Sequence, residues 1–192
     1  AGDDRVGMSL NSHQQELRHA YVRGGPGAII SGGVWFAAAL TAMYSSISDG
    51  FFLLFFAGMF IFPVSKLALK LVFQRAPESK SNPGSLICLE TVFPMVGGLF
   101  AAWLLLPYRP EFVFSASAIA VGTHYFGFRT AYGDWTYWVF GAVLCTIGLS
   151  SIALAIPSSS LVPFIVAIVE IVFGTWLILA DRMEAISKDE IG

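Results

Sequence analysis

Six side chains with acid–base or hydrogen-bonding chemistry lie within otherwise apolar stretches of the sequence. They are Lys66, Glu90, His124, Tyr125, Arg129 and Glu170. A charged side chain at the middle of a bilayer costs about 3 kcal/mol or more, so such residues usually face the interior of a helix bundle and pair there. A carboxyl group or a histidine in that position can take up a proton or hold a small polar substrate. These six residues are therefore the candidate proton- or substrate-binding residues.

The composition of the chain indicates a membrane protein. Of its 192 residues, 56% are hydrophobic and 12% are charged, and the mean hydropathy is +0.70. So few charges cannot cover the surface of a water-soluble domain. The formal net charge is -2 and there is no basic run, so we expect membrane lipid and no nucleic acid as a partner.

Six stretches are long and apolar enough to cross a bilayer, whose hydrocarbon core takes about 20 residues of helix. They cover residues 26–47, 50–73, 85–106, 112–132, 134–156 and 160–180. Turn-forming residues separate them, such as PYRP at 107–110. We therefore predict an all-α integral membrane protein in which residues 26–180 form one domain of six transmembrane helices.

The segments that flank this domain are polar. Residues 1–25 contain LNSHQQELRHAYV, in which Ser12 and Gln15 have the spacing of a capping box, and we predict a short amphipathic helix at the membrane surface. Residues 181–192 are predicted to be a cytoplasmic tail. Because the first apolar run is preceded by polar residues and is too long for a signal peptide, we expect it to be a retained anchor.

Basic residues predict how the helices are oriented. If the chain crosses the membrane six times, all Lys and Arg residues near the spans lie on one side of the membrane, except Arg109. Those on the basic side are Arg18, Arg23, Lys66, Lys70, Arg75, Lys80, Arg129, Arg182 and Lys188. Short loops rich in Lys and Arg stay in the cytoplasm, so both termini are predicted to be cytoplasmic.

The two halves of the chain share a weak similarity. GVWFAAALTA at 33–42 matches GTHYFGFRTA at 122–131 in its first glycine, its aromatic residues and its final TA. Three spans separate the two segments, so they would run in opposite directions, as in transporters built from 3+3 inverted repeats. Small and apolar residues also match by chance in membrane helices, and both explanations stay open.

Position along a span predicts which candidates meet. Glu90 lies about five residues into its span, or roughly 8 Å deep, and His124 lies about eight residues from the inner end of its own, or roughly 12 Å deep. Lys66 and Arg129 fall near the cytoplasmic boundary. We expect Glu90 to pair with His124 or Lys66, and Glu170 to lie deeper, near the midplane.

Each candidate also has a structural interpretation that the sequence leaves open. Lys66 and Arg129 could extend to the interface as positive-inside residues. His124 could be a neutral histidine bonded to a helix carbonyl or to Glu90. Two stripes of small residues also have two open interpretations, because they predict either close helix packing or a homo-oligomer contact. The stripes are Gly33, Ala37 and Thr41, and Ala142, Thr146 and Ser150.

The sequence contains no motif for a metal or a cofactor. HExxH, GxSxG and glycine-rich phosphate loops are absent, and one intramembrane histidine is too few for bis-histidine haem ligation. The two cysteines, Cys88 and Cys145, lie in apolar segments without CxxC spacing. We therefore expect neither a metal site nor a cofactor.

Four segments carry a resemblance to a known family. They are RHAYVRGGPGAIISGGVWF, FFAGMFIFPVSKLALKL, NPGSLICLETVFPMVGG and VGTHYFGFRTAYG, and they contain GxPG at Gly24–Gly27, FPxSK at Phe62–Lys66 and HY at 124–125. Together they resemble an uncharacterised bacterial family of small integral membrane proteins, described only as a domain of unknown function. The resemblance extends from about Leu17 to the last span. It implies a bacterial inner-membrane protein with six helices, and it implies no activity.

Three functions are open at this point. The first is a transporter or channel-like bundle for a small solute or a proton, with a polar cavity open to the cytoplasm. Glu90 and His124 would form its binding pair, Glu170 a relay, and Lys66 with Arg129 an anion-attracting rim. The second is a lipid-modifying enzyme that uses Glu90 or His124 as a general acid or base. The third is a structural or accessory subunit. We favour the first, which is not enzymatic.

Overall fold

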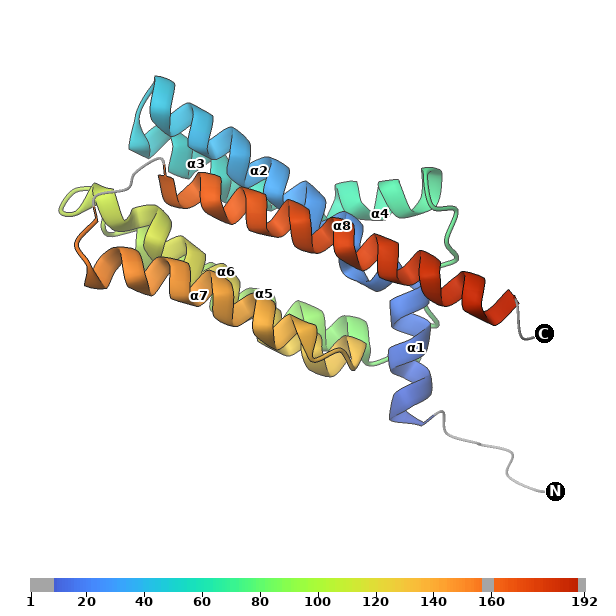
Figure 1. The fold of residues 1–192 in the computed structure, drawn as a ribbon. Helices are drawn as coiled ribbons and strands as arrows, with labels where there is room; N and C mark the ends of the chain where they lie inside the picture. The colour runs from blue at the N-terminus through green and yellow to red at the C-terminus, as the bar shows by residue number, and fades with distance from the viewer. Residues whose placement is uncertain (1–8, 157–160, 190–192) are drawn as a thin grey trace.

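The computed structural model describes residues 9–156 and 161–189, and every regular element in them is helical (Figure 1). The α-helices are α1 (Leu10–Ala20), α2 (Gly25–Tyr44), α3 (Ile47–Gly58), α4 (Ile61–Leu71), α5 (Gly84–Trp103), α6 (Val113–Tyr132), α7 (Thr136–Ala153) and α8 (Leu161–Asp189). Two short 3-10 helices, η1 (Val22–Gly24) and η2 (Pro110–Phe112), precede α2 and α6. The expected N-terminal helix is α1, but the predicted capping box at Ser12 is wrong: the N-cap is Ser9, whose side chain accepts a hydrogen bond from the Ser12 backbone N–H.

The long helices run back and forth between two ends of an elongated bundle (Figure 1). We call one the α1 end, where α1, the 72–83 connection, the α6–α7 turn and the last turns of α8 lie. The other is the far end. Helix α2 packs against α3, α4 and α8, which form the α2 group, while α6 packs against α5 and α7, which form the α6 group. Helix α8 also contacts α6 and α7, so the two groups meet along it.

Four helical segments in the described residues are long and apolar enough to cross a membrane. They are Val22–Tyr44, Gly84–Trp103, Thr136–Ala153 and Leu161–Ile186. Helices α3 and α4 qualify as a fifth only if they are taken as one span with a bend of 50°. The protein thus has the helices of a membrane protein, with four or five candidate spans rather than the six expected from the sequence.

Helix α6 is the predicted span that is missing even when α3 and α4 are counted as one span. It is 20 residues long, but it includes His124 and Arg129, which lower its mean hydropathy. Its neighbours explain why such a helix can lie in the bundle: α5 and α7 pack against it, α8 contacts it, and more than half of its residues are buried. A helix surrounded mainly by protein needs fewer apolar residues than one surrounded by lipid.

Glycines allow the closest helix contacts. A Cβ atom on Gly32 of α2 would lie 2.9 Å from the Ala167 carbonyl oxygen of α8, and a Cβ atom on Gly174 would lie 2.7 Å from the Gly25 carbonyl oxygen. Helices α6 and α7 approach in the same way at Gly122 and Gly141. Small residues that let backbones approach are the usual basis of helix packing in membranes.

The predicted stripes of small residues are not the residues that make these contacts. Gly33 is exposed, and a Cβ atom there would meet nothing within 4 Å. On α7, Ala142, Thr146 and Ser150 are also exposed. Each residue turns a helix by about 100°, so a shift of one position moves a stripe from the packed face to an outer one. The prediction of close packing within this chain is therefore wrong for Gly33 and for the α7 stripe.

Neighbouring glycines on α2 provide a matched test of this packing. Gly32→Val places a branched side chain against α8 and should lower the stability of the protein in detergent by about 1–3 kcal/mol. Gly33→Val has the same effect on helix propensity but meets open space, so its effect beyond propensity should stay within about 0.5 kcal/mol. Thermal unfolding followed by size-exclusion chromatography measures both. Equal destabilisation by the two variants would contradict the α2–α8 contact.

Candidate functional site

The fold brings two of the six candidate residues together and separates the others. Tyr125 of α6 and Glu170 of α8 meet in the core. His124 is half-buried on a different side of α6, next to α5. Glu90 and Arg129 are exposed, and Lys66 is half-buried near the α1 end. The candidates therefore do not form one polar cluster.

Glu170 is the most deeply buried of the six, with an exposed fraction of 0%. Its Oε1 atom accepts a hydrogen bond of 3.2 Å from the Tyr125 hydroxyl. Ser31 of α2 lies beside both groups. The Oε2 atom has no hydrogen-bond partner among the described residues. One carboxyl group is thus enclosed by three helices and only partly satisfied.

This arrangement restricts the charge that Glu170 can carry. In the part of the chain that the structure describes, no salt bridge involves Glu170. Burial of an unpaired charge is far more costly than burial of a neutral polar group, so the carboxyl group is neutral in this closed arrangement. Even the neutral form leaves an unsatisfied buried oxygen, which costs about 1–3 kcal/mol.

Aromatic rings fill the space between Glu170 and the α1 end. We call them the aromatic block; they are Tyr125, Phe128, Tyr132, Tyr137, Phe140 and Phe173. The Tyr137 ring stacks on that of Tyr125 at 6.3 Å and on that of Tyr132 at 5.3 Å. The rings of Phe140 and Phe173 stack at 3.9 Å. This block closes the core between the carboxyl group and one end of the bundle.

His124 and Lys66 have partners other than the predicted Glu90. The His124 Nδ1 atom lies 2.7 Å from the Thr91 hydroxyl on α5, and that hydroxyl donates to the Cys88 carbonyl oxygen, also at 2.7 Å. The Lys66 Nζ atom lies 3.3 Å from Glu78. In the described residues, no hydrogen bond or salt bridge joins Glu90 to either one, so the predicted pairs are not formed.

A cluster of charged groups joins the helices at the α1 end. Arg23, just before α2, lies 2.5 Å from Asp134 in the α6–α7 turn and 3.2 Å from Glu184 of α8. The Asp134 carboxyl group also accepts hydrogen bonds from the backbone and the hydroxyl of Thr136. Burial raises the pKa of Asp134, but the bonds from Thr136 and Arg23 outweigh it and lower the pKa below its ordinary 3.8. Asp134 is therefore charged at neutral pH.

Little in the sequence singles out this cluster. Arg23 is one of many basic residues near a span, and Asp134 is simply the residue that opens the fifth predicted span. Tyr137, whose hydroxyl donates to the Arg23 carbonyl oxygen at 2.5 Å, has the sequence position of an interfacial aromatic residue. The one local signal is Asp134 two residues before Thr136, a spacing typical of an aspartate that caps a turn.

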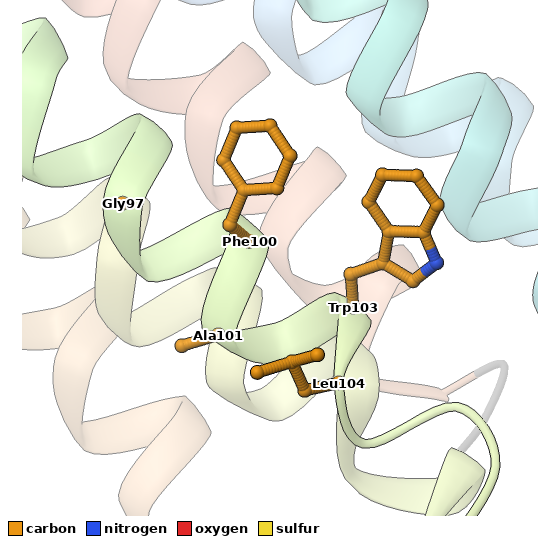
Figure 2. A pocket seen from close by; sticks show the side chains of 5 residues that line it. All are labelled: Gly97, Phe100, Ala101, Trp103 and Leu104. Carbon is orange, nitrogen blue, oxygen red and sulfur yellow. The ribbon is translucent and has the colours of Figure 1, made fainter.

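Two pockets on the outside of the bundle are separate from the buried carboxyl group. The larger, about 600 Å³, is lined by Gly97, Phe100, Ala101, Trp103 and Leu104 of α5 and its C-terminal turn (Figure 2). The smaller, about 290 Å³, lies between α7 and the start of α8. Neither is lined by Glu170, His124 or Glu90. In the described residues, no group of three or more His, Cys, Asp or Glu side chains could hold a metal ion.

Glu16 fastens α1 to the 72–83 connection. Its carboxylate accepts hydrogen bonds from the Ser79 backbone N–H at 2.7 Å, the Ser79 hydroxyl at 3.1 Å and the Asn82 amide at 2.7 Å. The Ser79 N–H, followed by the Asn82 amide, holds the pKa of Glu16 below its ordinary 4.5. These bonds favour the charged form, so protonation of Glu16 weakens the attachment of α1.

The attachment of α1 should consequently weaken in acid. A carboxyl group with a lowered pKa stabilises the folded state above its ordinary pKa of 4.5, and this contribution disappears as the pH falls through the lowered value. Hydrogen exchange in α1, corrected for the intrinsic rate, should therefore increase below about pH 4.5. Glu16→Gln should exchange faster at neutral pH and lose the further increase. Wild-type exchange that does not change with acidification would contradict this role.

Comparison with known proteins identifies a family but no relative of known activity. No curated protein and no solved structure matches the chain. A family model covers residues 10–180, which include every helix from α1 through most of α8. The chain therefore belongs to a family of unknown function, DUF7010, in agreement with the resemblance of its motifs to a domain of unknown function.

Proposed function

We propose that this protein moves protons across the membrane, and that Glu170 is the group that takes up and releases them. The observation that carries the proposal is the fully buried carboxyl group with one unpartnered oxygen. Such a group is costly to keep inside a bundle, and ionisable residues within membranes commonly mark proton or substrate pathways. Its position between α2, α6 and α8 puts it where the two helix groups meet.

The arrangement fits an occluded state of a transporter. Neither pocket includes Glu170, and the aromatic block lies between it and the α1 end. In alternating access, a midplane site is closed to both sides between two open states, and one helix group moves against the other. The α2 and α6 groups would be the moving parts here, with α8 along their contact.

Proton flux into liposomes tests the proposal. The purified protein is reconstituted with a pH-sensitive dye inside, and a potassium diffusion potential drives protons inward. Wild-type protein should acidify the interior faster than empty liposomes. Glu170→Gln keeps the size and hydrogen bonding of the side chain but cannot exchange a proton, so its flux should fall to the level of empty liposomes.

The control for this experiment is Glu90→Gln. It makes the same chemical change at an exposed carboxyl group that has no partner in the described residues, so its flux should equal that of the wild type. Both variants must elute as monodisperse protein before reconstitution. The proposal fails if wild-type flux equals that of empty liposomes, or if Glu170→Gln retains it.

A structural or accessory role is the second candidate, and a specific observation favours it. The Tyr125 hydroxyl and the His124 ring both have partners on neighbouring helices, which is the pattern of residues that lock helices together. Under this role Glu170→Gln would alter stability and leave no transport to lose. The flux measurement therefore also separates the two candidates.

We further infer six spans with both termini in the cytoplasm of a bacterial inner membrane. Helices α2, α3 with α4, α5, α6, α7 and α8 alternate in direction, and α6 would be the sixth, protein-surrounded span. Of the Lys and Arg residues in the described ranges, all but Arg109 lie toward the α1 end, which supports a cytoplasmic α1 end.

Thiol labelling in spheroplasts tests this orientation. The cysteine of Lys80→Cys, in the 72–83 connection at the α1 end, should not react with a membrane-impermeant thiol reagent until the membrane is opened.

A further inference from the structure

We infer that the Arg23–Asp134 ion pair is a gate that shuts Glu170 off from water at the α1 end. This inference rests on the proposed function, because a gate matters only if Glu170 must exchange with water. The ion pair lies at one end of the proposed pathway. Its distance from the carboxyl group is about 20 Å, counted along α8 from Glu170 to Glu184 at 1.5 Å per residue.

The first support is that the ion pair joins the two helix groups. Arg23 lies in η1, which leads directly into α2 of the α2 group, and Asp134 lies in the turn between α6 and α7 of the α6 group. The two side chains are 2.5 Å apart, and Asp134 is only 7% exposed. A partly desolvated, charge-assisted pair is stronger than a surface ion pair. Separating the groups at this end would break it.

The second support is that Arg23 is held under strain. Val22, Arg23 and Gly24 have φ angles of 50°, 53° and 84°, in the left-handed region. This conformation is uncommon for any residue other than glycine and an outlier for a β-branched valine, so tertiary contacts must hold it. The Arg23 Nε atom is also buried without a hydrogen-bond partner among the described residues. Opening would release both the strain and the unpaired donor, which lowers the net cost of opening.

The third support is a continuous connection from the ion pair to the carboxyl group. The Tyr137 hydroxyl donates to the Arg23 carbonyl oxygen, and the Tyr137 ring stacks on Tyr125, whose hydroxyl donates to Glu170. Tyr137 is 1% exposed. Movement of Arg23 away from α7 would free the Tyr137 hydroxyl and loosen the aromatic block above Glu170.

The far end lacks an equivalent in the described residues. Its ion pair, Arg109 with Glu111, joins residues two positions apart and does not link the groups. There the groups meet through apolar contacts such as Trp35 with Phe114. Among the described residues, an ion pair that links the two groups is therefore found at the α1 end and not at the far end.

Thiol labelling beside Glu170 tests the gate. Cys88 and Cys145 are first replaced by alanine, and Ser31→Cys then places a single thiol next to the carboxyl group. The protein is reconstituted in liposomes, and a membrane-impermeant methanethiosulfonate is added outside. A parallel Lys80→Cys sample measures the fraction of molecules whose α1 end faces outward. The labelling rate of the thiol at position 31 in that fraction is the readout.

Asp134→Asn should raise this rate about tenfold or more, which corresponds to a shift of about 1.4 kcal/mol toward the open state. Glu111→Gln breaks the local pair at the far end and should leave the rate unchanged. Exchanging the charges, with Arg23→Asp and Asp134→Arg in a Glu184→Gln background that removes the carboxylate facing position 23, should return the rate toward the wild-type value, and aspartate tolerates the left-handed backbone at position 23. If Asp134→Asn does not fold, Arg23→Asn removes the other charge of the pair, tolerates the left-handed backbone and provides the same comparison.

The outcomes keep the gate and the proposed function apart. The gate is overturned if the thiol at position 31 is labelled at the same rate, or more slowly, in Asp134→Asn than in the protein that keeps Asp134. This holds even if proton flux depends on Glu170. An increase on Asp134→Asn that the exchanged pair reverses supports the gate. If that increase occurs while wild-type flux equals that of empty liposomes, the ion pair closes the bundle and the transport function is the part that fails.

Discussion

Burial of the Glu170 carboxyl group between three helices is the constraint on which the rest of the core depends. Lipid cannot satisfy a carboxyl group, so it must find its partners within the protein. Tyr125 from α6 and Ser31 from α2 provide them, and this requires α2, α6 and α8 to meet at one level of the bundle. Glycines at the α2–α8 and α6–α7 contacts make that approach possible, because a side chain there would collide with the backbone of the next helix.

The two polar regions of the molecule differ in how many partners their charged groups have. At the α1 end, Arg23, Asp134 and Glu16 have several hydrogen bonds or ion pairs each, although the Arg23 Nε atom has no partner among the described residues. In the core, Glu170 has one hydrogen bond from Tyr125 at Oε1 and no partner at Oε2 among the described residues. Buried polar groups in native proteins are nearly always hydrogen-bonded. The partly unsatisfied carboxyl group in the apolar core is therefore a reason to look for function there. The network at the α1 end instead joins neighbouring helices through charged groups.

The sequence predicted the helical elements well because their signal is local. An apolar run bounded by glycine and proline indicates a helix regardless of its neighbours, and the predicted stretches coincide with α2, α3 with α4, α5, α6, α7 and α8. The site was predicted less well. Depth along a span was the guide, and it placed Glu90 beside His124, but depth says nothing about which side of a helix a residue occupies. His124 bonds to Thr91, one position after Glu90, and that single step turns the carboxyl group outward.

By itself, the sequence determined that the chain forms apolar helices typical of a membrane protein, which stretches contain them, and which residues are too polar to lie in lipid without a reason; it did not predict the break between α3 and α4 or the length of α8. Composition and local periodicity contain that information, because each residue contributes to it independently. The tertiary structure decided which polar residues meet: it paired Glu170 with Tyr125, Arg23 with Asp134 and Lys66 with Glu78. These partners are 12 to 111 positions apart in the chain, and only the rotation and packing of whole helices brings them within hydrogen-bonding distance.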